Sequence, residues 1–284
     1  MARRIKMDMI PLKRIFSKLS PKLLKNNGFK NVWEKYNKGN FNEAYADFLE
    51  VIKNQPRYSK VGDVYILWAD LELLANHDPH KAIELLDKAQ EIGCSQAQMA
   101  YCYTKRAEAL WETGERHMAL QCYERSVDAD PCAFYLSNLA RALSFLHDKR
   151  AMSVWQQVLE EDPKNCLAYT YIGWEVAKAG DRNKALLMAK KAEELQSSVR
   201  DVYEIGRLYH ELKEFQSAIS KYLEAKKLGC GDEGWLNAAI SECYLSLGDT
   251  SAARKYVQLA VQCDPENDYV KEILREYKER FGGG

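Results

Sequence analysis

Alanine recurs along this chain about every 35 residues, and this recurrence limits what the sequence can fold into. The seven markers are Ala44, Ala82, Ala119, Ala151, Ala185, Ala218 and Ala253. Mostly apolar residues follow four and seven positions after each marker, so all three positions lie on one stripe of an α-helix. A methyl-sized side chain at the marker lets two helices approach to about 8 Å. We therefore expect seven helical units that pack closely on one another.

Glycine and proline mark the ends of helices within the same period. Four glycines stand five residues before a marker, where the left-handed conformation ends a helix without a Cβ clash. They are Gly39, Gly114, Gly180 and Gly248. Four prolines stand twelve residues after a marker, where each one ends the second helix. They are Pro56, Pro131, Pro163 and Pro265. Each unit is predicted to be a helix, a tight turn and a second helix.

This pattern resembles the tetratricopeptide repeat family. Residues 166–198 carry the best match, through Tyr169, Ile172-Gly173, Gly180-Asp181 and Ala185. The resemblance implies an all-α fold, a right-handed α-solenoid of about seven helix-turn-helix units over residues 25–267. A basic segment with a short amphipathic helix is expected over 1–24, and a capping helix with a glycine tail over 268–284. Two places depart from the pattern: Asp70 stands where a small residue is expected, and the turns near 76–79 and 147–149 have unusual lengths.

Stacked helix pairs leave a curved inner surface lined by their first helices. In the family this groove holds a peptide of a partner, so the resemblance implies a non-catalytic scaffold or adaptor with a protein or peptide partner. Trp, Tyr and Arg at such positions are typical of binding hot spots. The same aromatic residues would also pack between repeats, and we expect three or four of them to be exposed. The inward positions hold Phe29, Trp33, Tyr101, Thr104, Glu108, Trp111, Phe134, Arg141, Phe145, Trp174, Tyr203, Arg207, Trp235 and Glu242.

The N-terminal segment differs from the rest in charge. Residues 1–30 carry a net charge of +8 and the remainder −8, although the whole chain is neutral. Between Pro11 and Pro21, apolar residues at helical spacing predict a short amphipathic helix whose other face holds Lys13, Arg14 and Lys18. The sequence leaves four roles open for it: a cap on the first repeat, contact with an anionic membrane, an organelle presequence, or contact with nucleic acid. The membrane role would make the protein a membrane-associated assembly or trafficking factor.

Two specialised partners are not expected for the array. Repeats that bind the C-terminal tails of Hsp70 and Hsp90 place Lys and Asn at the fifth and ninth family positions. None of the corresponding pairs matches here. They are Phe29/Trp33, Thr104/Glu108, Thr170/Trp174, Tyr203/Arg207 and Ala238/Glu242. RNA binding by the array needs a basic groove, whereas the body of this chain is acidic.

Catalysis, a cofactor and a metal site are not expected either. The five histidines are scattered, and no phosphate-loop, dinucleotide, zinc-protease or nucleophile-elbow motif occurs. The eight cysteines lack the C-x2–4-C spacing of zinc sites, so we interpret them as reduced thiols within helix packing. No apolar stretch reaches the roughly 18 residues that span a membrane. We expect a cytoplasmic protein, which the basic segment would make peripheral to a membrane.

Overall fold

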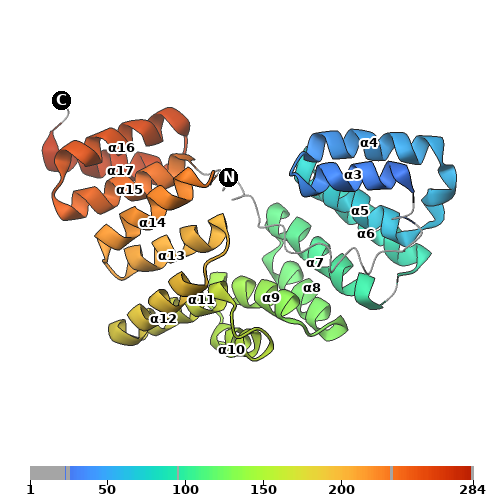
Figure 1. Cartoon of the computed structure of the whole chain (residues 1–284), viewed down its shortest axis with the longest axis horizontal. Coiled ribbons are helices and arrows are strands. Elements are labelled where there is room, and N and C mark those ends of the chain that lie inside the picture. Colours follow the sequence, from blue (N-terminus) through green and yellow to red (C-terminus); the bar gives the residue numbers. More distant parts are fainter. Residues whose placement is uncertain (1–22, 24–25, 95, 231–232, 283–284) are drawn as a thin grey trace. The chain divides into compact units, whose positions relative to one another are not determined.

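The computed structural model describes residues 23, 26–94, 96–230 and 233–282, and this part of the chain is helical without any β-strand (Figure 1). The predicted all-α repeat architecture is therefore confirmed. Lys13, Arg14 and Lys18 lie outside the described residues, so the amphipathic helix remains a prediction. No helix within the described ranges is both long and apolar enough to cross a membrane.

Contacts divide the chain into two compact units. Among the described residues, the N-terminal unit extends to Glu161 and the C-terminal unit begins at Asp162. Within each unit, consecutive helices pack in pairs. We call the two members of a pair the first helix and the second helix. The three-segment division predicted above is not tested by this split and remains a prediction.

The described part of the N-terminal unit contains four helix pairs. Two short irregular turns, η1 (Pro56–Lys60) and η2 (Glu72–Asn76), flank the first helix of its second pair. The pairs are α3 (Asn27–Asn37) with α4 (Phe41–Asn54), α5 (Gly62–Leu71) with α6 (Pro79–Ile92), α7 (Gln96–Thr113) with α8 (Arg116–Ala129), and α9 (Ala133–Phe145) with α10 (Ala151–Glu161).

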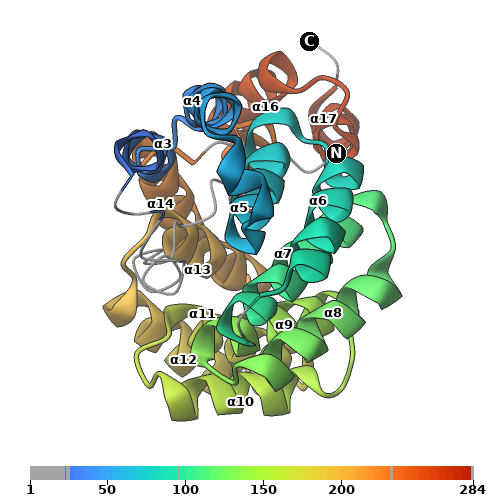
Figure 2. The same ribbon diagram turned by 90° about the vertical axis from the view of Figure 1, so that its right-hand side faces the viewer.

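The described part of the C-terminal unit contains three pairs and one additional helix. The pairs are α11 (Cys166–Lys178) with α12 (Arg182–Leu195), α13 (Val199–Glu211) with α14 (Phe215–Lys227), and α15 (Glu233–Leu247) with α16 (Thr250–Cys263). In both views each second helix lies beside its own first helix (Figure 2). The additional helix α17 (Asp268–Phe281) packs Val270 and Ile273 against α15 and α16, as expected of a cap.

The alanine markers form the contacts between paired helices. All seven are buried, with at most 1% of each exposed. The glycines of the first helices allow the same close approach: a Cβ on Gly206 would lie 2.8 Å from the ring of Tyr222. A Cβ on Gly173 would lie 2.8 Å from Leu208 and 3.6 Å from the backbone oxygen of Ala185. The two glycines therefore leave room for the packing of Tyr222 and Leu208.

The turns follow the predicted chemistry. Gly39, Gly114, Gly180 and Gly248 all have positive φ, between 77° and 90°. Where a repeat lacks this glycine, His77, His147 and Lys213 adopt the left-handed conformation, with φ of 54–59°. The helices α4, α8, α10 and α16 each end two residues before a proline, because the residue before proline disfavours helical backbone.

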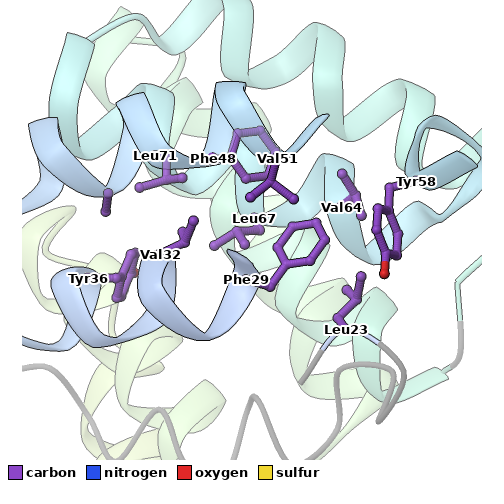
Figure 3. Packing of buried hydrophobic residues seen from close by; sticks show 11 residues of the cluster. Leu23, Phe29, Val32, Tyr36, Phe48, Val51, Tyr58, Val64, Leu67 and Leu71 are labelled. Carbon is purple, nitrogen blue, oxygen red and sulfur yellow. The ribbon is translucent and has the colours of Figure 1, made fainter. Parts of the chain in front are cut away.

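Aromatic packing builds the core of the first repeats. Phe29 and Val32 of α3 point toward Phe48 and Val51 of α4, and Leu67 of α5 completes the layer (Figure 3). Phe29 also meets Tyr58 edge to face, with ring centres 4.9 Å apart. The helix α3 therefore buries much of its apolar face in this core.

We predict that Ala185→Leu destabilises the protein by about 1–3 kcal/mol, because three added carbons have no space beside Gly173. Urea unfolding followed by circular dichroism measures the loss. Ala179→Leu, at an exposed position after α11, is the matched control and should change the stability little. Equal effects of the two substitutions would contradict the close-packing explanation.

Candidate functional site

In the C-terminal unit, three successive first helices bring aromatic rings around one arginine. The guanidinium carbon of Arg207 on α13 lies 4.8 Å from the ring centre of Trp174 on α11. It lies 5.8 Å from the ring centre of Trp235 on α15 and 6.0 Å from that of Tyr203. These distances are within the range of cation–π attraction. We call these four residues the Arg207 cluster.

An ion pair fixes the arginine within this cluster. Nη1 of Arg207 lies 3.1 Å from Oε2 of Glu204, one turn earlier on α13. The Glu204 side chain is 6% exposed, whereas the Arg207 side chain is 40% exposed. The buried carboxylate of Glu204 therefore fixes the guanidinium of Arg207. The guanidinium stays partly exposed, so it can stack on a ligand or donate hydrogen bonds to it.

The rings around the arginine support one another. Trp235 stacks on Tyr269 of α17, with ring centres 5.3 Å apart and an interplanar angle of 29°. It also meets Tyr203 at 5.4 Å, while Trp174 meets Tyr171 edge to face at 4.7 Å. Both tryptophans are half-buried, but Tyr203 is only 4% exposed. The tryptophans can therefore contact a ligand, and Tyr203 positions Trp235 from the core.

Glu242 of α15 belongs to a neighbouring polar group. Its carboxylate accepts a hydrogen bond from the hydroxyl of Tyr269, and its Oε1 lies 3.6 Å from Nε2 of His210. Burial raises the pKa of Glu242, but the hydrogen bonds from His210 and Tyr269 outweigh burial and lower the pKa below its ordinary value of 4.5. Because the folded state favours the ionised carboxylate, Glu242 stabilises the contact between α13, α15 and α17.

We predict that Glu242→Gln lowers the thermal stability at neutral pH and that the difference from wild type disappears in acid. The folded-state pKa lies below the unfolded-state value, so the stabilisation is complete above that value and is lost as the pH falls through the folded pKa. Melting temperatures at about pH 7, 5 and 3 measure the effect. Glu211→Gln, on an exposed position of α13, is the control for lost charge. A difference that persists unchanged at the lowest pH would disprove the assignment.

A second aromatic cluster lies in the N-terminal unit. Trp111 of α7 and Phe145 of α9 meet edge to face, with ring centres 5.2 Å apart. The guanidinium carbon of Arg116 lies 4.4 Å from the ring centre of Trp111 and 5.5 Å from that of Phe145. Phe145 is 62% exposed. The structure therefore brings the predicted groove residues Trp111 and Phe145 together. It also places Arg116 beside them, a residue that the sequence analysis did not include because it considered first helices and Arg116 is the first residue of the second helix α8.

Asp70 explains the departure from the repeat pattern noted above. Its side chain is fully buried, and it accepts hydrogen bonds from the hydroxyl groups of Tyr36 and Tyr101. Nζ of Lys105 lies 2.7 Å from Asp70 and 3.1 Å from Glu108. Burial and the charge of Asp70 raise the pKa of both tyrosines well above the ordinary value. The network joins α3, α5 and α7, so Glu108 is engaged inside the unit.

We predict that Lys105→Met destabilises the protein by about 3–5 kcal/mol, because Asp70 is left as a buried charge without its cation. The double variant Lys105→Met with Asp70→Asn should recover much of this loss, since the neutral amide still accepts from the tyrosines. Urea unfolding of the three proteins measures the coupling. Additive losses in the double variant would show that the pair does not interact as described.

Four of the predicted inward residues lie in the core instead. Phe29 is 4% exposed, Tyr203 is 4% exposed and Thr104 is 0% exposed. The hydroxyl of Thr104 is bonded within the core, 2.7 Å from that of Ser126 and 3.1 Å from the carbonyl of Ala100. For these residues the prediction of partner contact is corrected, because neighbouring helices cover their positions. Tyr101 is buried in the same way.

The remaining predicted positions are partly accessible. Trp33 stacks on Tyr36 with ring centres 5.5 Å apart and is half-buried, as are Phe134 and Arg141. The described residues contain no group of three or more His, Cys, Asp or Glu side chains that could hold a metal ion. Tryptophan, phenylalanine and arginine side chains are therefore accessible at several of these positions, and tryptophan and arginine are residue types enriched at binding hot spots.

Fold and site together define an α-helical repeat protein whose first helices present aromatic and cationic side chains. The sequence model of the tetratricopeptide repeat matches residues 100–131 and 236–267, which cover most of the pairs α7–α8 and α15–α16. The chain therefore contains tetratricopeptide repeats, and the resemblance seen in its sequence is confirmed.

Several known proteins are similar to this chain in sequence or in structure. Outer dynein arm-docking complex subunit 4 of Danio rerio is 33% identical over 97 residues, covering 31% of this chain and 20% of that protein. The crystal structure of the Cut9-Hcn1 hetero-tetramer of APC/C covers 94% of this chain and 50% of its own, with TM-score 0.70 and 16% identity. A tetratricopeptide repeat protein from Parabacteroides merdae covers 90% and 97%, with TM-score 0.65 and 14% identity. These structural similarities establish the fold. The chain spans a fifth of the curated relative and half of the Cut9-Hcn1 chain.

Proposed function

We propose that this protein is a non-catalytic scaffold or adaptor that binds a partner polypeptide at the Arg207 cluster. The observation that carries the proposal is the convergence of Trp174, Arg207 and Trp235 from three successive first helices, all partly exposed. Tryptophan and arginine are the residue types most enriched among binding hot spots. Their support by Tyr269 and Glu204 holds them in place before a partner arrives, which reduces the ordering cost of binding.

The class of protein agrees with this role. Tetratricopeptide repeat proteins are typically scaffolds for protein–protein interaction rather than enzymes. The relative from Danio rerio is named as a subunit of a docking complex, which supports a docking role here as well. A cytoplasmic location is part of the proposal.

The cluster favours a particular kind of partner segment. The two tryptophan faces suit an aliphatic or aromatic side chain, and the guanidinium suits a carboxylate or a backbone carbonyl. A segment with both features fits the surface, and burial of two or three such anchors, less the ordering cost, corresponds to roughly micromolar affinity. Phe145 with Trp111 offers an additional apolar contact for a partner of the N-terminal unit.

The alternative function rests on the N-terminal charge. The net charge of +8 over residues 1–30 favours a membrane-associated assembly or trafficking factor, in which Lys13, Arg14 and Lys18 contact anionic lipid. This role is compatible with partner binding at the Arg207 cluster, because the two involve different residues.

We predict that Trp174→Ala with Arg207→Ala weakens binding of the specific partner more than tenfold, since two hot-spot side chains are lost. The partner is isolated by affinity capture from native extract, and binding is then measured by calorimetry with the purified components. Arg207→Lys keeps the charge but loses the planar stacking group, so it should weaken binding less.

The matched control is Arg254→Ala with Gln258→Ala on exposed positions of α16. It should leave binding unchanged, and circular dichroism should show the same helicity for all variants. If the Trp174 and Arg207 variants retain every partner at full affinity, the proposed site is wrong.

A further inference from the structure

The second helices of the C-terminal unit are strongly basic. The helices α12, α14 and α16 hold nine cationic and three acidic side chains. The cations are Arg182, Lys184, Lys190, Lys191, Lys221, Lys226, Lys227, Arg254 and Lys255, and the acids are Glu193, Glu194 and Glu224. The first helices α11, α13 and α15 of the same unit hold three cations and six acids. Charge is thus separated between the two layers of helices.

The N-terminal unit has no such separation in its described second helices. Its helices α4, α6, α8 and α10 hold ten acidic and five cationic side chains. The basic layer is therefore a property of the C-terminal unit rather than a consequence of the repeat.

Most of these cations are available to a ligand. Seven of the nine are exposed, whereas Lys221 is buried in ion pairs with Glu193 and Glu224. Lys191 pairs with Glu194, and Arg182 pairs with Glu214. Among the described residues no acid lies within ion-pair distance of the other five exposed cations, which are Lys184, Lys190, Lys227, Arg254 and Lys255. We call the exposed cationic side of α12, α14 and α16 the basic face.

The three helices lie next to one another in the unit. Nζ of Lys221 on α14 lies 2.9 Å from Oε1 of Glu193 on α12. Nζ of Lys226 on α14 lies 5.9 Å from the ring centre of Tyr256 on α16. These contacts connect α12 to α14 and α14 to α16, so the three helices that carry the basic face are neighbours.

An exposed leucine lies among the lysines. Leu187 of α12 is 62% exposed, and its helical spacing places it beside Lys184, Lys190 and Lys191. The buried stripe of the same helix, formed by Ala185, Ala189 and Ala192, faces the other way. Lysine around an exposed leucine is typical of surfaces that contact the headgroup region of a bilayer, where the leucine enters the apolar boundary.

We propose that the basic face binds the surface of an anionic phospholipid membrane. Lysine outnumbers arginine among its exposed cations, and a flexible point charge suits mobile headgroups, whereas bidentate recognition of a fixed group favours arginine. A bilayer offers an apolar region that the exposed Leu187 can enter, whereas the phosphate backbone of a nucleic acid offers none. The inference is independent of the Arg207 cluster, because it involves the second helices, and independent of residues 1–24.

Vesicle co-sedimentation of the full chain tests the proposal. Vesicles of phosphatidylcholine alone are compared with vesicles that contain about 30% phosphatidylserine, at low and high salt. Wild type should bind only the anionic vesicles, and salt should weaken binding. Four charge reversals should reduce the binding constant about tenfold or more. They are Lys184→Glu, Lys190→Glu, Lys191→Glu and Lys227→Glu.

A control with the same change in net charge separates this face from general attraction. It reverses four exposed lysines elsewhere and should retain most of the binding. They are Lys53→Glu, Lys60→Glu, Lys149→Glu and Lys278→Glu. Deletion of residues 1–24 should leave the difference between the two charge variants in place. Equal binding by the two charge variants would overturn the proposal.

Leu187→Ser distinguishes lipid from other anionic partners. It should weaken vesicle binding about threefold or more, because the apolar contact is lost while charge is kept, and it should leave retention on heparin unchanged. Unaltered vesicle binding by this variant would show that the face recognises charge alone. A basic face that binds a duplex or an acidic peptide but no vesicle would likewise refute the lipid assignment.

Discussion

The close approach of paired helices is the constraint on which the other features depend. Small residues stand where the paired helices come close, as with Ala185 near Gly173, and larger buried side chains fill the space around them. Proximity of this kind leaves little freedom in the position of a first helix relative to its neighbours. The side chains on the inner surface therefore keep fixed mutual distances, which is what a binding surface needs.

Polar contacts then connect one pair to the next. In the N-terminal unit, buried Asp70 joins three first helices through two tyrosines and Lys105. In the C-terminal unit, Glu242 joins α13, α15 and α17 through His210 and Tyr269. Buried charges cost desolvation, and this cost is offset only in a well-defined geometry. Such groups therefore favour one register of stacking over alternatives that apolar contacts alone would tolerate.

The two layers of the C-terminal unit have different chemistry. Its first helices carry aromatic rings around Arg207, whereas its second helices carry exposed lysines. A helical repeat permits this separation, because each helix buries one face in the core and leaves its opposite face to carry other side chains. One unit can thus support binding of a polypeptide on one layer and binding of an anionic surface on the other.

The amino-acid sequence by itself determined the repeat, the helix ends and the buried stripe, because alanine spacing, glycine turns and prolines act locally along the chain. The tertiary structure decided which inward positions reach solvent. Phe29, Thr104 and Tyr203 share the periodicity of Trp174 and Arg207, yet neighbouring helices cover them. The helical periodicity of the sequence identifies the face of the helix on which a residue lies. Whether that residue is exposed also depends on the neighbouring helices, and a local sequence pattern does not show how these helices pack. The position of Arg116 over Trp111 is decided in the same way.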